Sequence, residues 1–137
     1  MPLRSLRILW ALALCAGACG SSQTSAPTPA VAGAMAEVDV ATLKAARDAG
    51  TVAVVDVRTP AEYADGHVPG AINIPVDSLA QRMSELAPHK DADLFLICRS
   101  GARSARAQSL LLDAGYAHPI NVAGGTLAWQ SAGFPVE

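Results

Sequence analysis

The sequence predicts an α/β fold in which a parallel sheet is covered by helices on both faces. From Glu37 onward, short apolar runs alternate with segments of helical pattern. The runs at 51–57 and 93–98 are almost continuously apolar, which is typical of strands that are buried on both faces. Strands that alternate with helices pair in parallel, and such sheets bind ligands at the carboxyl ends of their strands.

Start and stop signals mark the helices between these strands. A capping box starts a short helix after the first buried run, with Thr59 at the N-cap, Pro60 at N1 and Glu62 at N3. A second box, Ser78 with Gln81, starts the next helix. The remaining predicted elements are a strand and a helix within 38–50, a strand within 71–75, a helix that ends at Gly115, a strand at 119–122, and a glycine turn with a short helix within 124–133.

The composition fits one folded domain and argues against nucleic acid as a partner. The chain has 137 residues, a formal net charge of −2 and 51% hydrophobic residues. Proteins that bind phosphate backbones carry a clustered basic surface, and this mildly acidic chain shows no such cluster. We expect a monomer that binds small molecules.

The first residues have the features of a secretory signal peptide. Arg4 and Arg7 precede an apolar stretch that is too short to cross a bilayer comfortably. The Ala-Gly-Ala before Cys19 resembles both a leader-peptidase site and a bacterial lipobox. We therefore expect a lipid on Cys19 that anchors the protein in the bacterial cell envelope, facing the periplasm. The alternative is a plain secreted protein. The expected parts are a signal peptide at 1–18, the anchor cysteine with a disordered tether at 19–36, and the folded domain at 37–137.

Cys98 is the one cysteine left for chemistry. The chain has three cysteines; Cys15 is expected to leave with the signal peptide, and Cys19 is expected to be acylated. In an oxidising compartment, Cys98 then has no partner for an internal disulfide. It ends a buried strand directly before a helix. Its thiol is therefore either buried and inert or part of a functional site.

The loop after Cys98 favours the thiolate, which is the reactive form of a cysteine. The N-terminus of the following helix carries about half a positive charge, and Gly101 helps the backbone N–H groups to converge on an anion. Arg99 and Arg103 add full charges, and Arg103 is expected to hold an anion most directly because it lies nearest the helix start. Arg106 is assigned to the solvated face of the helix. The same features would bind an anionic substrate.

Three motifs in this order resemble those of the single-domain rhodaneses, a family of sulfurtransferases. The segment 98–104, Cys-Arg-Ser-Gly-Ala-Arg-Ser, resembles the active-site loop of the family. The segment 56–75 resembles its Asp-x-Arg strand end and Gly-His-x-Pro-Gly-Ala turn, and 122–129 resembles its Gly-Gly-x-x-x-Trp element. The resemblance covers residues 37–137 and implies a rhodanese-like fold, with a five-stranded parallel sheet flanked by helices on both faces.

The resemblance also implies covalent catalysis of sulfur transfer. Cys98 would take the outer sulfur of an anionic donor such as thiosulfate, become a persulfide, and pass the sulfur to cyanide, a thiol or a protein acceptor. Arg58 is expected mainly to pair with Asp56 at its strand end. No cofactor is implied, and no metal is expected, because three separated histidines and one thiol lack ligand spacing. The residues expected at the substrate are Arg99, Ser100, Gly101, Ala102, Arg103, Ser104 and Arg58.

Two alternatives stay open. Cys98 could belong to a persulfide carrier without turnover of its own, or to a redox sensor. A phosphatase or an arsenate reductase with this fold is a further possibility. Such a phosphatase uses Cys-x5-Arg to clamp a tetrahedral oxyanion, whereas Ser104 is the sixth residue after Cys98 and Arg103 comes one place early.

Overall fold

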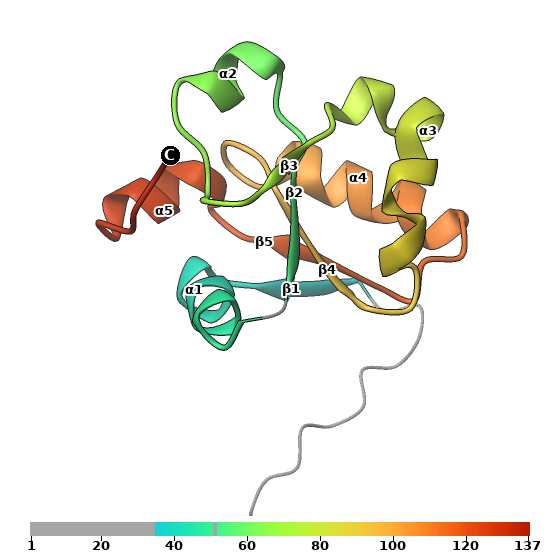
Figure 1. Cartoon of the computed structure of the whole chain (residues 1–137), viewed down its shortest axis with the longest axis horizontal. Coiled ribbons are helices and arrows are strands. Elements are labelled where there is room, and N and C mark those ends of the chain that lie inside the picture. The colour runs from blue at the N-terminus through green and yellow to red at the C-terminus, as the bar shows by residue number, and fades with distance from the viewer. Residues whose placement is uncertain (1–34, 51) are drawn as a thin grey trace, which may run out of the picture.

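Five parallel strands form one sheet in the computed structural model, which describes residues 35–50 and 52–137. The strands are β1 (Ala36–Val38), β2 (Ala53–Asp56), β3 (Ile72–Asn73), β4 (Asp93–Ile97) and β5 (His118–Val122). Their order across the sheet is β1-β5-β4-β2-β3, so β4 lies at the centre (Figure 1). The predicted five-stranded parallel sheet is therefore confirmed.

Helices cover both faces of this sheet, as predicted (Figure 1). They are α1 (Val40–Asp48), α2 (Pro60–Ala64), α3 (Leu79–Arg82), α4 (Ala102–Asp113) and α5 (Gly125–Ser131), with the 3₁₀ helices η1 (Val76–Ser78) and η2 (Met83–His89) on either side of α3. Helices α1 and α5 lie on one side of the sheet, and α3 and α4 lie on the other.

The N-terminal predictions lie outside the described residues. This applies to the signal peptide at 1–18, to Cys19, and to the tether as far as residue 34. Strand β1 begins at Ala36, so the sheet includes the last residue of the segment assigned to the tether. Among the helices of the described segments, none combines the length and the hydropathy that a membrane span requires.

The central strand β4 divides its side chains between two hydrophobic clusters, because successive residues of a strand point to opposite faces. Leu96 and Cys98 belong to the cluster under α3 and α4, together with Leu111. Ile97 belongs to the cluster under α1 and α5, together with Trp129. This double burial explains the continuous apolar run in the sequence, and it brings Cys98 out on the α4 side of the sheet.

The two predicted capping boxes have different outcomes. Thr59 starts α2 as predicted, because its side chain accepts the backbone N–H of Glu62 while the Glu62 carboxylate accepts the N–H of Thr59. The box at Ser78 is wrong. Since η1 runs directly into α3, Ser78 already has near-helical angles (φ −100°, ψ −6°) and makes no side-chain cap bond. A capping side chain needs an extended backbone at its own position.

Candidate active site

Cys98 follows the central strand and lies at the carboxyl end of the sheet. Its side chain is 1% exposed. Gly101 donates its backbone N–H to the Sγ atom of Cys98 at 3.0 Å, and the Oγ atom of Ser104 lies 3.4 Å from the same sulfur. Gly101 is the N-cap of α4 and has φ 111°, an angle that residues with a side chain rarely adopt. The glycine therefore allows the turn that directs the loop toward the sulfur.

Hydrogen bonds lower the pKa of the Cys98 thiol below its ordinary value. Burial is the largest single effect and raises the pKa, because it disfavours the charged form. The hydroxyl and backbone N–H of Ser104, with the N–H groups of Gly101 and Ser100, together outweigh it. The loop thus favours the thiolate mainly through its own donors, which is how a nest of backbone N–H groups acts.

Helix α5 holds this loop by contacts that the sequence does not predict. Thr126 donates its backbone N–H to the carbonyl of Cys98 at 2.8 Å. Leu127 donates in the same way to the carbonyl of Arg99 at 3.1 Å. Gly125 makes the close approach possible, since it has φ 56° and a Cβ atom there would lie 2.3 Å from the Cys98 carbonyl oxygen. The Gly-Gly pair in the sequence predicts a tight turn near the site, but not the backbone that it contacts.

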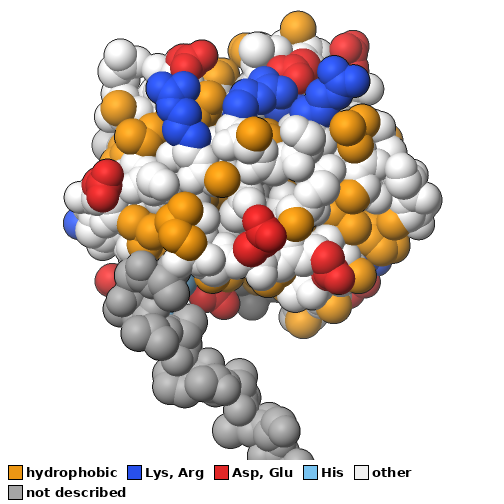
Figure 2. All heavy atoms as spheres, turned by 180° about the vertical axis from the view of Figure 1, so that it is seen from behind, with side chains coloured by type: hydrophobic (Ala, Val, Ile, Leu, Met, Phe, Trp, Pro, Cys, Tyr) orange, Lys and Arg blue, Asp and Glu red, His pale blue; other side chains and the backbone are white. Residues whose placement is uncertain are grey.

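The arginines of the loop differ in how their charges are balanced. The sequence predicts a full positive charge at Arg103, but the structure pairs Arg103 with Glu62 of α2 through two hydrogen bonds of 2.7 Å. Arg106 pairs with Asp77 at 3.3 Å on the exposed surface, as predicted for a solvated face. Arg99 is exposed and has no ion-pair partner in the part of the chain that the structure describes. Figure 2 shows basic side chains interspersed with acidic ones along one edge of the molecule.

Glu62 has a second role beyond the capping box that the sequence assigns to it. The hydrogen bonds from Arg103 lower the pKa of the Glu62 carboxyl to about 2, although burial opposes the shift. The same carboxylate also accepts the backbone N–H of Thr59 at 3.0 Å. One side chain therefore caps α2 and fixes the direction of an arginine on α4.

Arg58 pairs with Asp56 at the end of β2, as predicted. Its guanidinium donates to both carboxylate oxygens at 2.6 to 3.0 Å and to the carbonyl of Gly66 at 2.9 Å. Arg58 is 5% exposed. It also lines, with Arg99, a hollow of about 240 Å³ beside the start of α5. The pair fixes the loop after β2, while a contact of Arg58 with substrate stays a prediction.

The other predicted site residues divide between the surface and the interior. Ser100 and Ala102 are exposed, whereas Ser104 is fully buried. The hydroxyl of Ser104 lies 2.6 Å from the Oδ1 atom of Asn121, and the Nδ2 atom of Asn121 donates to the Glu37 carboxylate at 2.8 Å. Sequence reasoning missed Asn121 and Glu37, and the available signal was an asparagine inside an otherwise apolar strand.

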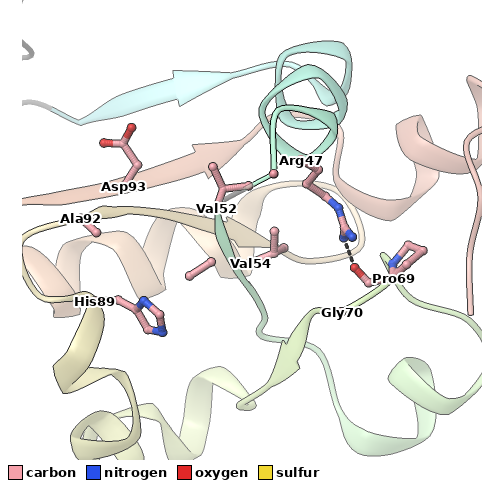
Figure 3. A pocket seen from close by; sticks show the side chains of 10 residues that line it. Arg47, Val52, Val54, Pro69, Gly70, His89, Ala92 and Asp93 are labelled. Atoms are coloured by element: carbon pink, nitrogen blue, oxygen red, sulfur yellow. Dashed lines mark hydrogen bonds between the residues drawn. The ribbon is translucent and has the colours of Figure 1, made fainter.

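A larger hollow lies at the other end of the sheet, where β2 and β4 begin (Figure 3). Its volume is about 390 Å³, and its polar lining includes Arg47, His89 and Asp93. Arg47 donates a hydrogen bond to the carbonyl of Pro69. None of the described lining residues carries a thiol or a hydroxyl. Within the described segments, no three His, Cys, Asp or Glu side chains gather as a metal site would require.

Comparisons with known proteins agree with this geometry. The model of the rhodanese-like domain family matches residues 39–132. A protein of Allochromatium vinosum named Sulfurtransferase is 44% identical over 89 residues, which cover 65% of this chain and 81% of that protein. Thiosulfate sulfurtransferase PspE of Escherichia coli is 37% identical over 70 residues, 51% of this chain and 67% of that protein. The crystal structure of a rhodanese-related protein of Thermoplasma volcanium aligns with a TM-score of 0.66 and 32% identity, over 74% of this chain and 97% of that one.

The matched region contains Cys98, its loop, and the start of α5 that holds the loop. It accounts for more than half of the chain and for four of the five strands, β2 to β5. The chain therefore belongs to the rhodanese-like domain family.

Proposed function

We propose that this protein is a sulfurtransferase that moves a sulfane sulfur from an anionic donor such as thiosulfate, through a persulfide on Cys98, to a thiophilic acceptor. The observation that carries the proposal is the surrounding of Sγ by loop donors, with the N–H of Gly101 at 3.0 Å and a lowered thiol pKa. Family membership and relatives named as sulfurtransferases support the same general activity.

The first half-reaction is a displacement at sulfur. The Cys98 thiolate attacks the outer sulfur of thiosulfate, a new S–S bond forms, and sulfite leaves with the electrons of the bond that breaks. The N–H groups of Ser100 to Ser104 would stabilise the anionic sulfur. The mechanism needs no general base, because these donors lower the pKa of the thiol. Arg99, which has no ion pair with any residue that the structure describes, would meet the sulfonate, since Arg103 is engaged by Glu62.

The second half-reaction returns the thiolate. Cyanide or a thiolate acceptor attacks the outer sulfur of the persulfide, and the Cys98 thiolate departs with the electron pair of the S–S bond. The same N–H groups that favour the resting thiolate make Cys98 a good leaving group, because a thiol of lower pKa leaves faster. No cofactor takes part in either displacement.

Intact mass of the purified full chain after exposure to thiosulfate tests the proposal. We expect the gain of one sulfur atom, located on the Cys98 peptide, and its loss on addition of cyanide. The Cys98→Ser protein is the matched control and should gain nothing. Persulfide on another residue, or no persulfide at all, would contradict the mechanism, while persulfide that only a partner protein can remove would identify a carrier.

The sequence and burial of the loop argue against the phosphatase alternative. Ser104 occupies the place of the clamping arginine, and it is buried and bonded to Asn121. An arginine that clamps a tetrahedral oxyanion needs a position from which its side chain can extend toward the substrate, and position 104 is buried. Phosphate-ester hydrolysis by the wild-type chain, measured beside the mass experiment, is expected to be absent.

The location of the protein belongs to the proposal as well. The signal-like N-terminus and the Ala-Gly-Ala-Cys sequence support a lipid on Cys19 and a domain that faces the periplasm. Membrane fractionation of the wild-type protein and of Cys19→Ala tests this, with release or blocked processing expected for the variant. Recovery of the unmodified wild-type protein in the soluble fraction would leave simple secretion.

A further inference from the structure

A chain of hydrogen-bonded polar groups, buried at Ser104 and Asn121, connects the reactive sulfur to the edge strand of the sheet. Ser104 of α4 lies 3.4 Å from the Cys98 Sγ atom and 2.6 Å from Oδ1 of Asn121 on β5. Asn121 in turn donates from Nδ2 to the Glu37 carboxylate on β1 at 2.8 Å. Glu37 and Asn121 are directly paired in the parallel register of β1 and β5. The chain is therefore built into the pairing of the two strands.

The proton of the Ser104 hydroxyl has three neighbours that could accept it. Besides the sulfur and Asn121, the carbonyl of Gly101 lies at 3.0 Å. That carbonyl already accepts the N–H of Ala105 at 3.0 Å. The Oδ1 atom of Asn121 is the nearest acceptor, and Asn121 is 4% exposed. Since a buried acceptor without a donor is costly, the proton lies toward Asn121.

This proton arrangement weakens one of the donations that favour the Cys98 thiolate, while the loop N–H groups keep theirs. When Ser104 donates to Asn121, its oxygen presents lone pairs toward the sulfur, which an S–H group can use and a sulfur anion cannot. The hydroxyl donates to a thiolate without competition only when the Asn121 amide turns over and offers Nδ2 to Ser104. Its Oδ1 atom would then face the Glu37 carboxylate, and two acceptors repel each other.

We propose that Glu37 and Asn121 are positioning residues that set the protonation of Cys98 through Ser104. The Glu37 carboxylate holds the amide of Asn121 in the orientation in which Oδ1 competes with the sulfur for the Ser104 proton, so that the donation of the hydroxyl to the sulfur is weakened. Glu37 is exposed and can leave its contact, so the hold is released when its side chain turns to water. The loop N–H groups donate to sulfur in either state, and Ser104 is the donor that is switched.

The other charged groups near Cys98 do not belong to this chain of hydrogen bonds. Arg103 of α4 is paired with Glu62 of α2, Asp56 at the end of β2 is paired with Arg58, and Arg99 is exposed. Within the described residues, no cation forms an ion pair with Glu37. Variants at positions 37, 104 and 121 therefore test the hydrogen-bond chain without breaking an ion pair.

The inference deepens the proposed function, because it concerns the ionisation of the same thiol, but its test needs no sulfur donor. The rate of iodoacetamide alkylation is followed against pH on the Cys98 peptide of the full chain, by mass spectrometry. Glu37→Gln allows both amide orientations, and Asn121→Val removes the competing acceptor without a change of charge. Each is expected to lower the midpoint by about half a unit to one unit, and Ser104→Ala to raise it, in line with hydrogen-bond effects on pKa.

A double-mutant cycle separates this coupling from a simple charge effect. In the Ser104→Ala background, Glu37→Gln should no longer move the midpoint, because the hydroxyl that transmits the effect is gone. Asp91→Asn, which neutralises an exposed carboxylate that forms no ion pair within the described residues, is the matched control and should move nothing. A shift that persists without Ser104, or an unchanged midpoint in Glu37→Gln, would overturn the proposal. Thermal unfolding checks that each variant is folded. If Asn121→Val does not fold, the cycle of Glu37→Gln and Ser104→Ala still tests the proposal, because position 37 is exposed.

Discussion

The two ends of the sheet each carry an arginine and a hollow, yet they differ in what surrounds them. At the amino end, Arg47 contributes to a hollow of about 390 Å³ and donates to a single carbonyl. At the carboxyl end, Arg99 lines a smaller hollow of about 240 Å³. Among the described residues, only this end adds a buried thiol, with the N–H of Gly101 at 3.0 Å from its sulfur.

The difference shows that the size of a hollow is a poor guide to chemistry in this fold. In a parallel sheet, the strands all end on one side, and the helices that follow them begin there. Two helix starts thus meet at Cys98: α4 provides donors for the sulfur, and α5 binds the carbonyls of the loop. The amino end receives helix C-termini instead, which offer no N–H groups to an anion.

The thiol at the carboxyl end gives the largest expected effect. Cys98→Ser should abolish sulfur transfer and leave the fold intact, because serine fills the same space but cannot form a persulfide. Thiocyanate production from thiosulfate and cyanide measures the loss, and thermal unfolding checks the fold. Residual turnover of the purified variant would show that Cys98 is not the catalytic residue.

The contact between α5 and the loop should rank next. Gly125→Ala would place a Cβ atom 2.3 Å from the Cys98 carbonyl oxygen, so the loop must shift, and a shift near 1 Å can lower kcat/KM by roughly 100-fold. Gly133→Ala is the matched control, since Gly133 also has a positive φ, 72°, but nothing lies within 4 Å of its added Cβ. An equal loss in the two variants would show that backbone strain, rather than the contact, matters, and wild-type activity in Gly125→Ala would contradict the prediction.

The arginines that follow Cys98 should have smaller effects on kcat/KM than Gly125. Arg99→Ala is expected to lower kcat/KM for thiosulfate by about tenfold, the loss of one charge-assisted hydrogen bond in a solvated position. Arg103→Ala should have the smaller effect on donor binding, because Glu62 already neutralises that charge. The acceptor step, started from preformed persulfide, should stay unchanged. Arg106→Ala serves as the control, and similar losses for Arg99 and Arg106 would reduce the arginines to surface charge.

The Glu62–Arg103 pair predicts a pH-dependent stability difference. The pKa of Glu62 is about 2 in the folded protein, below the ordinary 4.5, so its stabilising effect is present above pH 4.5 and is lost as the pH falls toward 2. Glu62→Gln should therefore lower the free energy of unfolding by about 1 kcal/mol at neutral pH, a value reduced by solvent screening. Denaturant titration at pH 7 and near pH 2 measures this, and a difference that persists at the lower pH would refute the ion-pair origin.

The hollow at the amino end supplies the smallest expected change. Arg47→Ala removes the arginine that lines this hollow. The kcat/KM for thiosulfate should nevertheless stay within about twofold of wild type, because a charge so far from Cys98 is screened. A loss comparable to that of Arg99→Ala would show that the two ends of the sheet act together.

The sequence predicts the sheet, its covered faces and the position of Cys98, because these follow from local patterns. Continuous apolar runs identify β2 and β4. The turn at Gly101 is predicted because a glycine stands three residues after Cys98, directly before the helix. The predicted box at Ser78 is wrong because a local motif competes with the 3₁₀ turn that precedes it.

Long-range pairings account for what the sequence does not predict. The ion pair of Arg103 joins residues that are 41 positions apart, and the bond between Asn121 and Glu37 spans 84. Nothing local distinguishes a free arginine from a paired one, so the charge at Arg103 is overestimated from the loop alone. The order of strands decides both pairings, and that order is a property of the whole fold.

Strand β1 has a practical consequence for how the protein is cut for study. The family match begins at residue 39 and ends at residue 132, so a fragment drawn to those limits lacks β1. The sheet would end at β5, and the backbone of β5 that now pairs with β1 would become an open edge, the kind of surface that invites association. It would also lack Pro135, whose carbonyl accepts the indole N–H of Trp129 at 2.8 Å. Such a fragment would keep every motif residue and still report the reactivity and solubility of a different molecule.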